Sequence, residues 1–467
     1  MGETTLVPAT VKVRAYQVGF GDAFLLTFEY PEAEQESDRE RHVLIDFGST
    51  GMPKGVDSSE QMMKVAEDIR KRCGPKLHMI VASHRHKDHI SGFATNRAGT
   101  ATGDIIASLN PDIVVQPWTE EPQAQDPPAG DLPVPEPSPA QKATKEYLSS
   151  LDNMNARAGV AHAEATYLTS AKFRMPLEED LADQITFLSE DNVPNKLAVA
   201  NLVRMGARPG AKNHYVSYGY KLDLTELLPG VTARFLGPPS LEQHAAIRKE
   251  RSEDENEFWM LHAATHGFWH LQAATGELIR DLTADNSQLF PEANTYEDYF
   301  PSHDRWFIRQ LRTLRGEQLQ GLVRILDKSM NNTSVILLLE AGGKKLLFPG
   351  DAQIENWEYA LKTDDNLKLL KDVHLYKVGH HGSRNATPKT LWKNFAGKGA
   401  KDSTDDRLKT VISTMKGKHG HSKSQTEVPR TTLANELTTL SDCTSTEIAA
   451  ENGELYVEIE VTLNPGK

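Results

Sequence analysis

The sequence of 467 residues predicts an α/β fold. Three observations lead to this expectation. Apolar or alternating runs typical of strands recur along the chain, a helix-type segment lies between two of them, and histidines and aspartates gather directly after several of the runs. In α/β proteins the side chains that carry chemistry tend to follow the carboxyl ends of buried strands.

The first hundred residues supply the clearest elements. Strands are expected at 11–18, 22–30 and 42–48, each bounded by glycine or charged residues, and at 77–84, a nearly continuous apolar run. The segment 58–72 has the pattern of a helix, with Ser58 or Ser59 as its N-cap.

The middle of the chain contains two segments that do not fit the strand pattern. Residues 117–140 are rich in proline and predict an exposed loop, and residues 241–325 are charged and aromatic and predict a largely helical insertion. Strands are expected between them at 183–190, 220–228 and 231–238. We therefore expect one elaborated domain over 10–467 that contains both segments.

Strand signals return in the last third of the chain. In 334–352, two apolar runs flank Gly342 and Gly343, a pair typical of a tight hairpin. Further strands are expected at 373–383 and 409–415, and 454–463 alternates apolar and polar residues as a half-buried strand does.

Composition limits the class of protein. The net charge of −13 weighs against broad, nonspecific DNA binding, although a metal site with a basic rim could still accept a nucleic acid. No apolar run approaches the ~18 residues of a membrane span, and the first residues do not resemble a signal peptide. With only two cysteines, Cys73 and Cys443, a cytoplasmic protein without membrane association is expected.

The densest polar cluster is "ASHRHKDHISGF" at 82–93, which contains His84, His86, Asp88 and His89. On an extended chain, residues two apart project to the same side, so His84 and His86 could reach one ion together. Asp88 and His89 fall in the turn beyond and could bind a second ion. A solvated polar loop is the alternative, but this spacing of imidazoles and a carboxylate favours a site for zinc or manganese.

Two later segments carry matching residues after apolar runs. Asp351 follows the run that ends in "LLFPGDA", and the pair His380-His381 follows "VHLYKVG". A carboxylate that bridges two ions completes a two-metal centre, and Asp351 is placed for that role.

These motifs resemble the metallo-β-lactamase fold superfamily, whose His-x-His-x-Asp-His signature "SHRHKDHISG" matches, and within it the ComEC-like hydrolase branch of DNA-uptake proteins. The branch is similar in "VGFGDAFLL" with Asp22, "LIDFG" with Asp46, "NNTSVIL" from Asn331, and the "GD" and "HHGS" elements. The resemblance covers roughly 11–118, 184–240, 327–436 and 454–463. It implies a four-layer αββα sandwich with two mixed sheets.

The resemblance also implies roles for individual residues. His84 and His86 would hold one divalent ion, and Asp88, His89 and His380 the other, with Asp351 between them. The order of His380 and His381 is open; His380 is the preferred ligand and His381 the preferred proton donor. Asp46 would orient a ligand histidine. The residues expected in catalysis are Asp88, His381 and His421, and those expected to bind substrate are Ser383 and Asn332.

Two features leave alternatives open. Many superfamily members have a further histidine on the first ion, which has no clear counterpart here, as is common in the ComEC-like branch. His262, His266 and His270 recur at helical spacing, but no glutamate follows His262, so a packing helix is the preferred interpretation over a second metal site.

Two metal ions activate a water molecule and stabilise the charge that develops during hydrolysis. The leading hypothesis is a phosphodiesterase or nuclease that acts on DNA or RNA. The alternatives are a hydrolase of a small ester or phosphoester, a regulated subunit that binds a protein partner or a second copy through 241–325, and a degenerate fold retained for binding.

Overall fold

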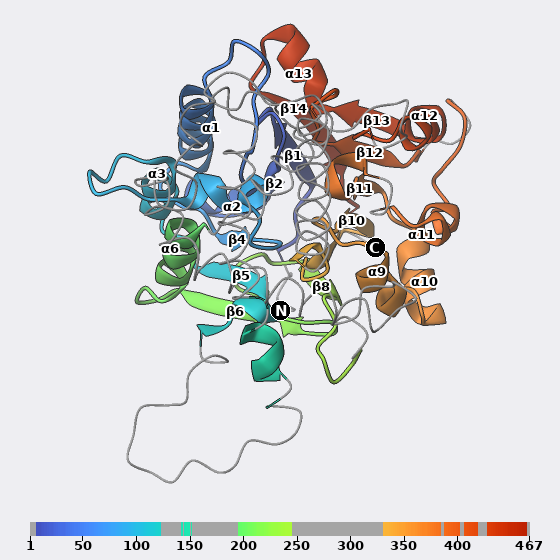
Figure 1. Cartoon of the computed structure of the whole chain (residues 1–467), viewed down its shortest axis with the longest axis horizontal. Coiled ribbons are helices and arrows are strands. Elements are labelled where there is room, and N and C mark those ends of the chain that lie inside the picture. The colour runs from blue at the N-terminus through green and yellow to red at the C-terminus, as the bar shows by residue number, and fades with distance from the viewer. Residues whose placement is uncertain are drawn as a thin grey trace, which may run out of the picture.

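Two mixed β-sheets of seven strands each lie at the centre of the protein (Figure 1). The computed structural model describes residues 6–122, 142, 144–149, 151, 195–244, 330–383, 387–401, 406–418 and 427–464. The expected α/β fold with two mixed sheets is confirmed. Within the described part of the chain, no helix has the length and apolar character needed to cross a bilayer.

The first sheet has the strand order β14-β1-β2-β3-β4-β5-β6. Its strands are antiparallel from β14 to β3 and parallel from β3 to β6. Their bounds are β1 (Thr10–Tyr16), β2 (Ala23–Glu29), β3 (Glu40–Phe47), β4 (Met79–Val81), β5 (Ile113–Pro117), β6 (Lys212–Val216) and β14 (Tyr456–Thr462).

The second sheet has the order β13-β12-β11-β10-β9-β8-β7, and its strands are parallel from β13 to β10 and antiparallel from β10 to β7. Their bounds are β7 (Lys221–Leu222), β8 (Val231–Gly237), β9 (Ile336–Ala341), β10 (Lys344–Phe348), β11 (Leu375–Lys377), β12 (Lys409–Ile412) and β13 (Asp442–Ser445). The parallel halves bring the carboxyl ends of neighbouring strands to one edge of each sheet.

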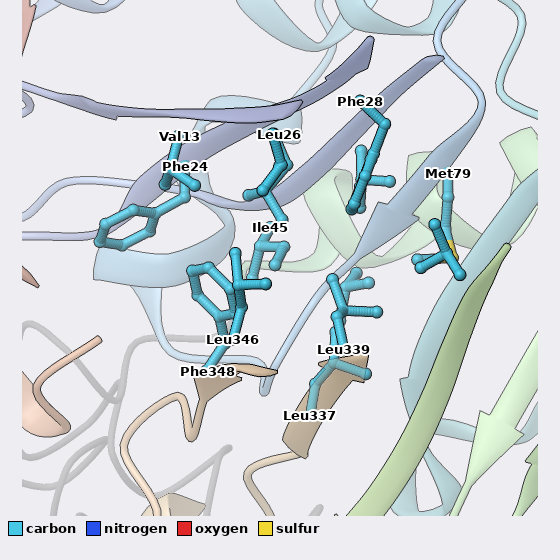
Figure 2. Close-up of a cluster of buried hydrophobic side chains, with 14 of the residues drawn as sticks. Val13, Phe24, Leu26, Phe28, Ile45, Met79, Leu337, Leu339, Leu346 and Phe348 are labelled. Atoms are coloured by element: carbon cyan, nitrogen blue, oxygen red, sulfur yellow. The ribbon is translucent and has the colours of Figure 1, made fainter. Parts of the chain in front are cut away.

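The main hydrophobic core lies between the sheets. Alternate residues of strands from both sheets point toward one another, as Phe24 and Leu26 of β2 do toward Leu337 and Phe348 (Figure 2). This follows from the period-two alternation of side chains along a strand. The intervening residues face outward: Leu25 and Leu44 belong to a separate outer cluster.

Helices cover the outer faces of both sheets. The first sheet packs against α1 (Ser58–Cys73), α3 (Thr102–Ser108) and α6 (Lys196–Gly206). The second packs against α9 (Ile354–Ala360), α10 (Asp364–Lys371), α11 (Lys389–Asn394) and α12 (Thr431–Leu440). The short α2 (Lys87–Ile90) follows β4, and α13 (Thr446–Asn452) precedes β14. In Figure 1 the two sets of helices lie on opposite sides of the strands.

Two local expectations are corrected. The N-cap of α1 is Asp57, whose carboxylate accepts a hydrogen bond from Glu60 N at 2.8 Å, and not Ser58 or Ser59. The expected strand at 220–228 is reduced to Lys221–Leu222, because Asp223 Oδ1 accepts hydrogen bonds from the N–H and hydroxyl of Thr225 and turns the chain. The hairpin at Gly342-Gly343 is confirmed, with φ of 50° and 73°.

Three expected segments fall wholly or mostly outside the described residues. They are the strand at 183–190, the proline-rich loop beyond residue 122, and the insertion at 241–325 beyond residue 244. The start of the proline-rich segment is a short 3-10 turn, Trp118–Glu120, that follows β5 directly.

Directly before the amino-terminal end of β4 lies His78, a buried histidine that is expected to make the folding stability sensitive to acid. Burial and the nearby His42 lower the pKa of His78 to about 3, and its Nδ1 accepts a hydrogen bond from His42 N at 3.0 Å. The ring is therefore neutral in the folded state but binds a proton below pH ~6.5 in the unfolded chain. This contribution to stability is complete above that pH and is lost as the pH falls, by ~1.4 kcal/mol per unit.

We expect His78→Asn, which keeps an acceptor at the Nδ1 position, to be less sensitive to acid. Between pH 7.5 and 5.0 the wild-type protein should lose about 2 kcal/mol more unfolding free energy than the variant, measured with urea. Equal losses would contradict this assignment.

Candidate metal centre

Strand ends from both sheets converge on one cluster of histidines and aspartates. Asp46 lies near the end of β3, His84 follows β4, Asp351 follows β10, and His381 lies in a 3-10 turn after β11. The backbone at Asp46 and His381 is left-handed, with φ of 55° and 52°. Such conformations are uncommon for residues other than glycine and concentrate at functional sites.

Three groups in this cluster have the composition of a metal site, with one ligand atom of each residue within 4.8 Å of the others in its group. His84, His86 and Asp88 form the first group, and Asp88, His89, Asp351 and His381 form the second. The third contains Asp22, Asp46 and His89, whose Nδ1 already donates to Asp46 Oδ2 at 2.8 Å. All these residues are buried. Asp88 belongs to both the first and the second group, and Asp351 belongs to the second.

The second group is tightly assembled. His89 Nε2 lies 3.1 Å from Asp351 Oδ2 and 3.6 Å from Asp88 Oδ2. His381 Nε2 lies 2.9 Å from Asp88 Oδ2 and 3.8 Å from Asp351 Oδ2. Both imidazoles thus direct the same ring nitrogen toward the same pair of carboxylates.

The opposite ring nitrogens are held by the protein. His89 Nδ1 donates to Asp46 Oδ2 at 2.8 Å, and His381 Nδ1 donates to the carbonyl of Ser413 at 2.9 Å. Asp46 also accepts hydrogen bonds from Ser83 N and Ser83 Oγ, both at 2.7 Å. Metal-binding histidines are commonly oriented in this way. The expectation that Asp46 orients a histidine of the cluster agrees with this geometry.

The carboxylates and imidazoles of the cluster shift one another's pKa values. Burial alone would lower the pKa of His89, but the charges of Asp351, Asp88, Asp46 and Asp22 outweigh it and raise that pKa well above its usual range. For Asp351, burial is outweighed by the nearby histidines, which hold its pKa well below the usual range. Closely spaced buried carboxylates of this kind favour a bound cation.

Two orphaned atoms show that the residues fit metal ions. His84 Nε2 and Asp88 Oδ1 are buried and have no hydrogen-bond partner among the described residues. Buried polar atoms without partners are costly, and coordination to a metal would satisfy both. The donor set of imidazole nitrogens and carboxylate oxygens is one that divalent ions such as zinc or manganese accept.

The structure places the two adjacent histidines differently from the sequence-based preference. His381 belongs to the second group, whereas His380 does not. The side chain of His380 is 19% exposed, its Nδ1 contacts Ser383 Oγ at 2.9 Å, and its Nε2 lies 3.8 Å from Asp351 Oδ2. His381 is therefore the better-placed ligand, and His380 lies at the rim of the cluster.

The other expected residues are less central. Ser383 contacts His380 at the rim, but Asn332 is buried and donates to Glu355 Oε2 at 3.3 Å. His421 lies outside the described residues, as do His262, His266 and His270.

Two residues at or beside the site, Lys377 and Arg85, were not predicted from the sequence. Lys377 has its ammonium buried beside Asp22 and 3.7 Å from Asp351 Oδ1. Arg85 forms a bidentate ion pair with Glu120, with contacts of 2.8 and 2.7 Å. This pair connects residues 84–89, which we call the histidine loop, to the end of β5. The only sequence signal for Lys377 is a charged residue within an apolar run, two positions before the expected Gly-His-His element.

No protein-family model matches the chain, and no curated protein matches it.

Proposed function

We propose that the protein is a metal-dependent hydrolase of the metallo-β-lactamase fold superfamily and that its substrates are phosphodiesters. The observation that carries this proposal is the pair of overlapping groups of buried ligand-type side chains, with orphaned atoms at His84 and Asp88. Structural zinc sites have closed ligand shells, often rich in cysteine, whereas mixed sets of histidine and carboxylate ligands are typical of catalytic sites.

The arrangement of layers supports the fold assignment. Helices on both outer faces of the two sheets agree with a four-layer αββα sandwich. The cluster lies at the strand ends where the ComEC-like motifs led us to expect it, with the histidine loop after β4 and Asp351 and His381 after β10 and β11. We infer membership of the ComEC-like branch from these motifs.

Two divalent ions, when bound, would activate water and stabilise negative charge during displacement. The protein's own residues orient the candidate ligands and supply a hydrogen-bond donor beside them. The hydroxyl of Ser383 can donate to His380 Nδ1, which leaves the proton of a neutral imidazole on Nε2. Since His380 is partly exposed beside Asp351, this N–H can donate a hydrogen bond to a leaving-group oxygen.

A lysine that is linked to the cluster through Gly51 and Phe20 supports the choice of a phosphodiester over a neutral ester. Phe20 packs against His381, with ring centroids 4.2 Å apart, and its backbone forms an isolated antiparallel β-bridge with Gly51. The side chain of Lys418 crosses Gly51, since a Cβ added there would lie 2.7 Å from Lys418 Cε. A lysine in this position can attract an anionic substrate.

The test is hydrolysis after the metals have been removed with a chelator and Mn²⁺ or Zn²⁺ has been restored. We expect metal-dependent cleavage of DNA, RNA or bis-p-nitrophenyl phosphate that disappears in His84→Ala/His86→Ala. His214→Gln is the matched control, because His214 lies on β6 and contacts Tyr220 at 2.9 Å. Cleavage of the chromogenic ester alone would refute a nuclease, and hydrolysis of none of the three by metal-loaded protein would refute the phosphodiesterase.

A further inference from the structure

A lysine ammonium is buried between the sheets, directly beside the metal centre. Lys377 ends β11 and is 1% exposed. Its Nζ forms an ion pair with Asp22, donates to the carbonyl of Gly350 at 3.2 Å, and lies 3.7 Å from Asp351 Oδ1. Lysine is almost never buried in this way unless it is paired, and the three oxygens around Nζ account for its burial.

Asp22 reaches the same point from the first sheet. It precedes β2, is fully buried, and its backbone N–H donates to the carbonyl of Asp88 at 2.9 Å. Its carboxylate oxygens lie 3.6 Å from Nδ1 of His89 and 3.6 Å from Nδ1 of His381. Asp22 therefore touches residues from both halves of the metal centre.

The candidate ligands are divided between the sheets. His84, His86, Asp88 and His89 follow β4 of the first sheet, whereas Asp351 and His381 follow strands of the second. A functional site has to be held within ~0.5 Å of its working geometry, so the two sheets must be fixed relative to each other at this edge. Apart from the ligands, the contacts that cross between the sheets here include the Asp22–Lys377 ion pair, a 2.5 Å hydrogen bond from Ser413 Oγ to the carbonyl of Gly21, and a 2.9 Å hydrogen bond from Val335 N to the carbonyl of Ser83.

We infer that Asp22 and Lys377 form a clamp between the sheets that positions Asp351 and His381 against the ligands of the first sheet. Lys377 holds the Gly350–Asp351 turn on one side, and Asp22 faces His89 and His381 on the other. Both are positioning residues and neither is a catalytic residue. The inference rests on the proposed metal binding but does not depend on the substrate.

A pair that only balances charge would behave differently from a clamp. The double variant Asp22→Asn/Lys377→Met removes both charges with little change in volume, so the charge balance is kept and the clamp is lost. Asp22→Asn alone leaves the ammonium with Asp351 as its nearest carboxylate, where it competes with the metal. We expect both variants to bind Co²⁺ at least tenfold more weakly than the wild type and with altered visible absorption bands.

Co²⁺ binding is measured by calorimetry and by absorption spectroscopy on metal-free full-length protein, with folding followed by circular dichroism. The matched control is Glu40→Gln/Arg72→Met, which removes the bidentate pair of 2.7 and 2.9 Å at the far end of β3. This variant should bind Co²⁺ as the wild type does.

Three results would overturn the clamp. Wild-type Co²⁺ affinity and spectrum in the double variant would show that the pair does no more than balance charge. Failure of both variants to fold in saturating Co²⁺ would make the pair a folding determinant instead. A wild-type protein that binds no Co²⁺ would also overturn it, whereas one that binds Co²⁺ but cleaves no phosphodiester would overturn only the proposed function.

Discussion

Asp88→Asn is expected to abolish binding of both metal ions and to lower metal-dependent hydrolysis by at least about a thousandfold. Asp88 is the residue shared by the first and second ligand groups, and a neutral amide is a much poorer ligand than a carboxylate. Loss of the metals removes several kcal/mol of charge stabilisation in the transition state, and each ~1.4 kcal/mol corresponds to tenfold in rate. Metal content by elemental analysis and the initial rate of hydrolysis measure the two effects.

Asp351→Asn provides the comparison. Asp351 belongs only to the second group, so this variant should keep one ion with His84, His86 and Asp88. Asp112→Asn is the matched control, because Asp112 pairs with Lys76 directly before β5, at the opposite end of that strand from the cluster. If Asp88→Asn retained two ions per chain, or if Asp351→Asn lost both, Asp88 would not be the shared ligand.

Much of the fold could be predicted because the relevant signals are local. The alternation of 454–463 appears in β14 as alternating inward and outward residues, and the glycine pair fixes the hairpin between β9 and β10. The N-cap of α1 could not be chosen, since Asp57, Ser58 and Ser59 are all good caps and only the folded backbone selects one of them. The strand at 220–228 was overpredicted because a side chain of Asp223 competes for the backbone.

One part of the candidate site could be predicted from local sequence patterns, whereas another part depends on residues that lie far apart in the sequence. The spacing of His84, His86, Asp88 and His89 was enough to predict that they meet. The order of His380 and His381 was not predictable, because left-handed backbone at both residues, with φ of 42° and 52°, determines which ring turns inward. Lys377 was missed because its burial depends on Asp22, which lies on the other sheet and far away in the sequence.

The second large effect is expected from Asp46→Asn, which should weaken metal binding about 10- to 100-fold without changing a proposed ligand. In the wild type, Oδ1 of Asp46 accepts from Ser83 N, and Oδ2 accepts from Ser83 Oγ and from His89 Nδ1. An asparagine offers only one acceptor oxygen. Asparagine also tolerates the left-handed backbone at this position, so the change tests the side chain and not the turn.

Either orientation of the new amide places an N–H against another N–H. If its oxygen faces Ser83 N, its NH₂ group faces His89 Nδ1, which must then become an acceptor and move its proton to Nε2. That proton would occupy the nitrogen that points toward Asp351 and Asp88 and would block coordination. In the opposite orientation the NH₂ group opposes Ser83 N and displaces the start of the histidine loop.

The position of the proton on His89 tests this mechanism directly. Nitrogen NMR of histidine-labelled protein should detect the Nδ1–H form in the metal-loaded wild type and the Nε2–H form in Asp46→Asn, while Asp112→Asn keeps the wild-type pattern. Calorimetric titration with Co²⁺ gives the affinities. A variant that binds both ions with wild-type affinity and keeps the proton on Nδ1 would mean that Asp46 serves Ser83 and the strand end, and that the orientation of His89 is fixed by the carboxylates it faces.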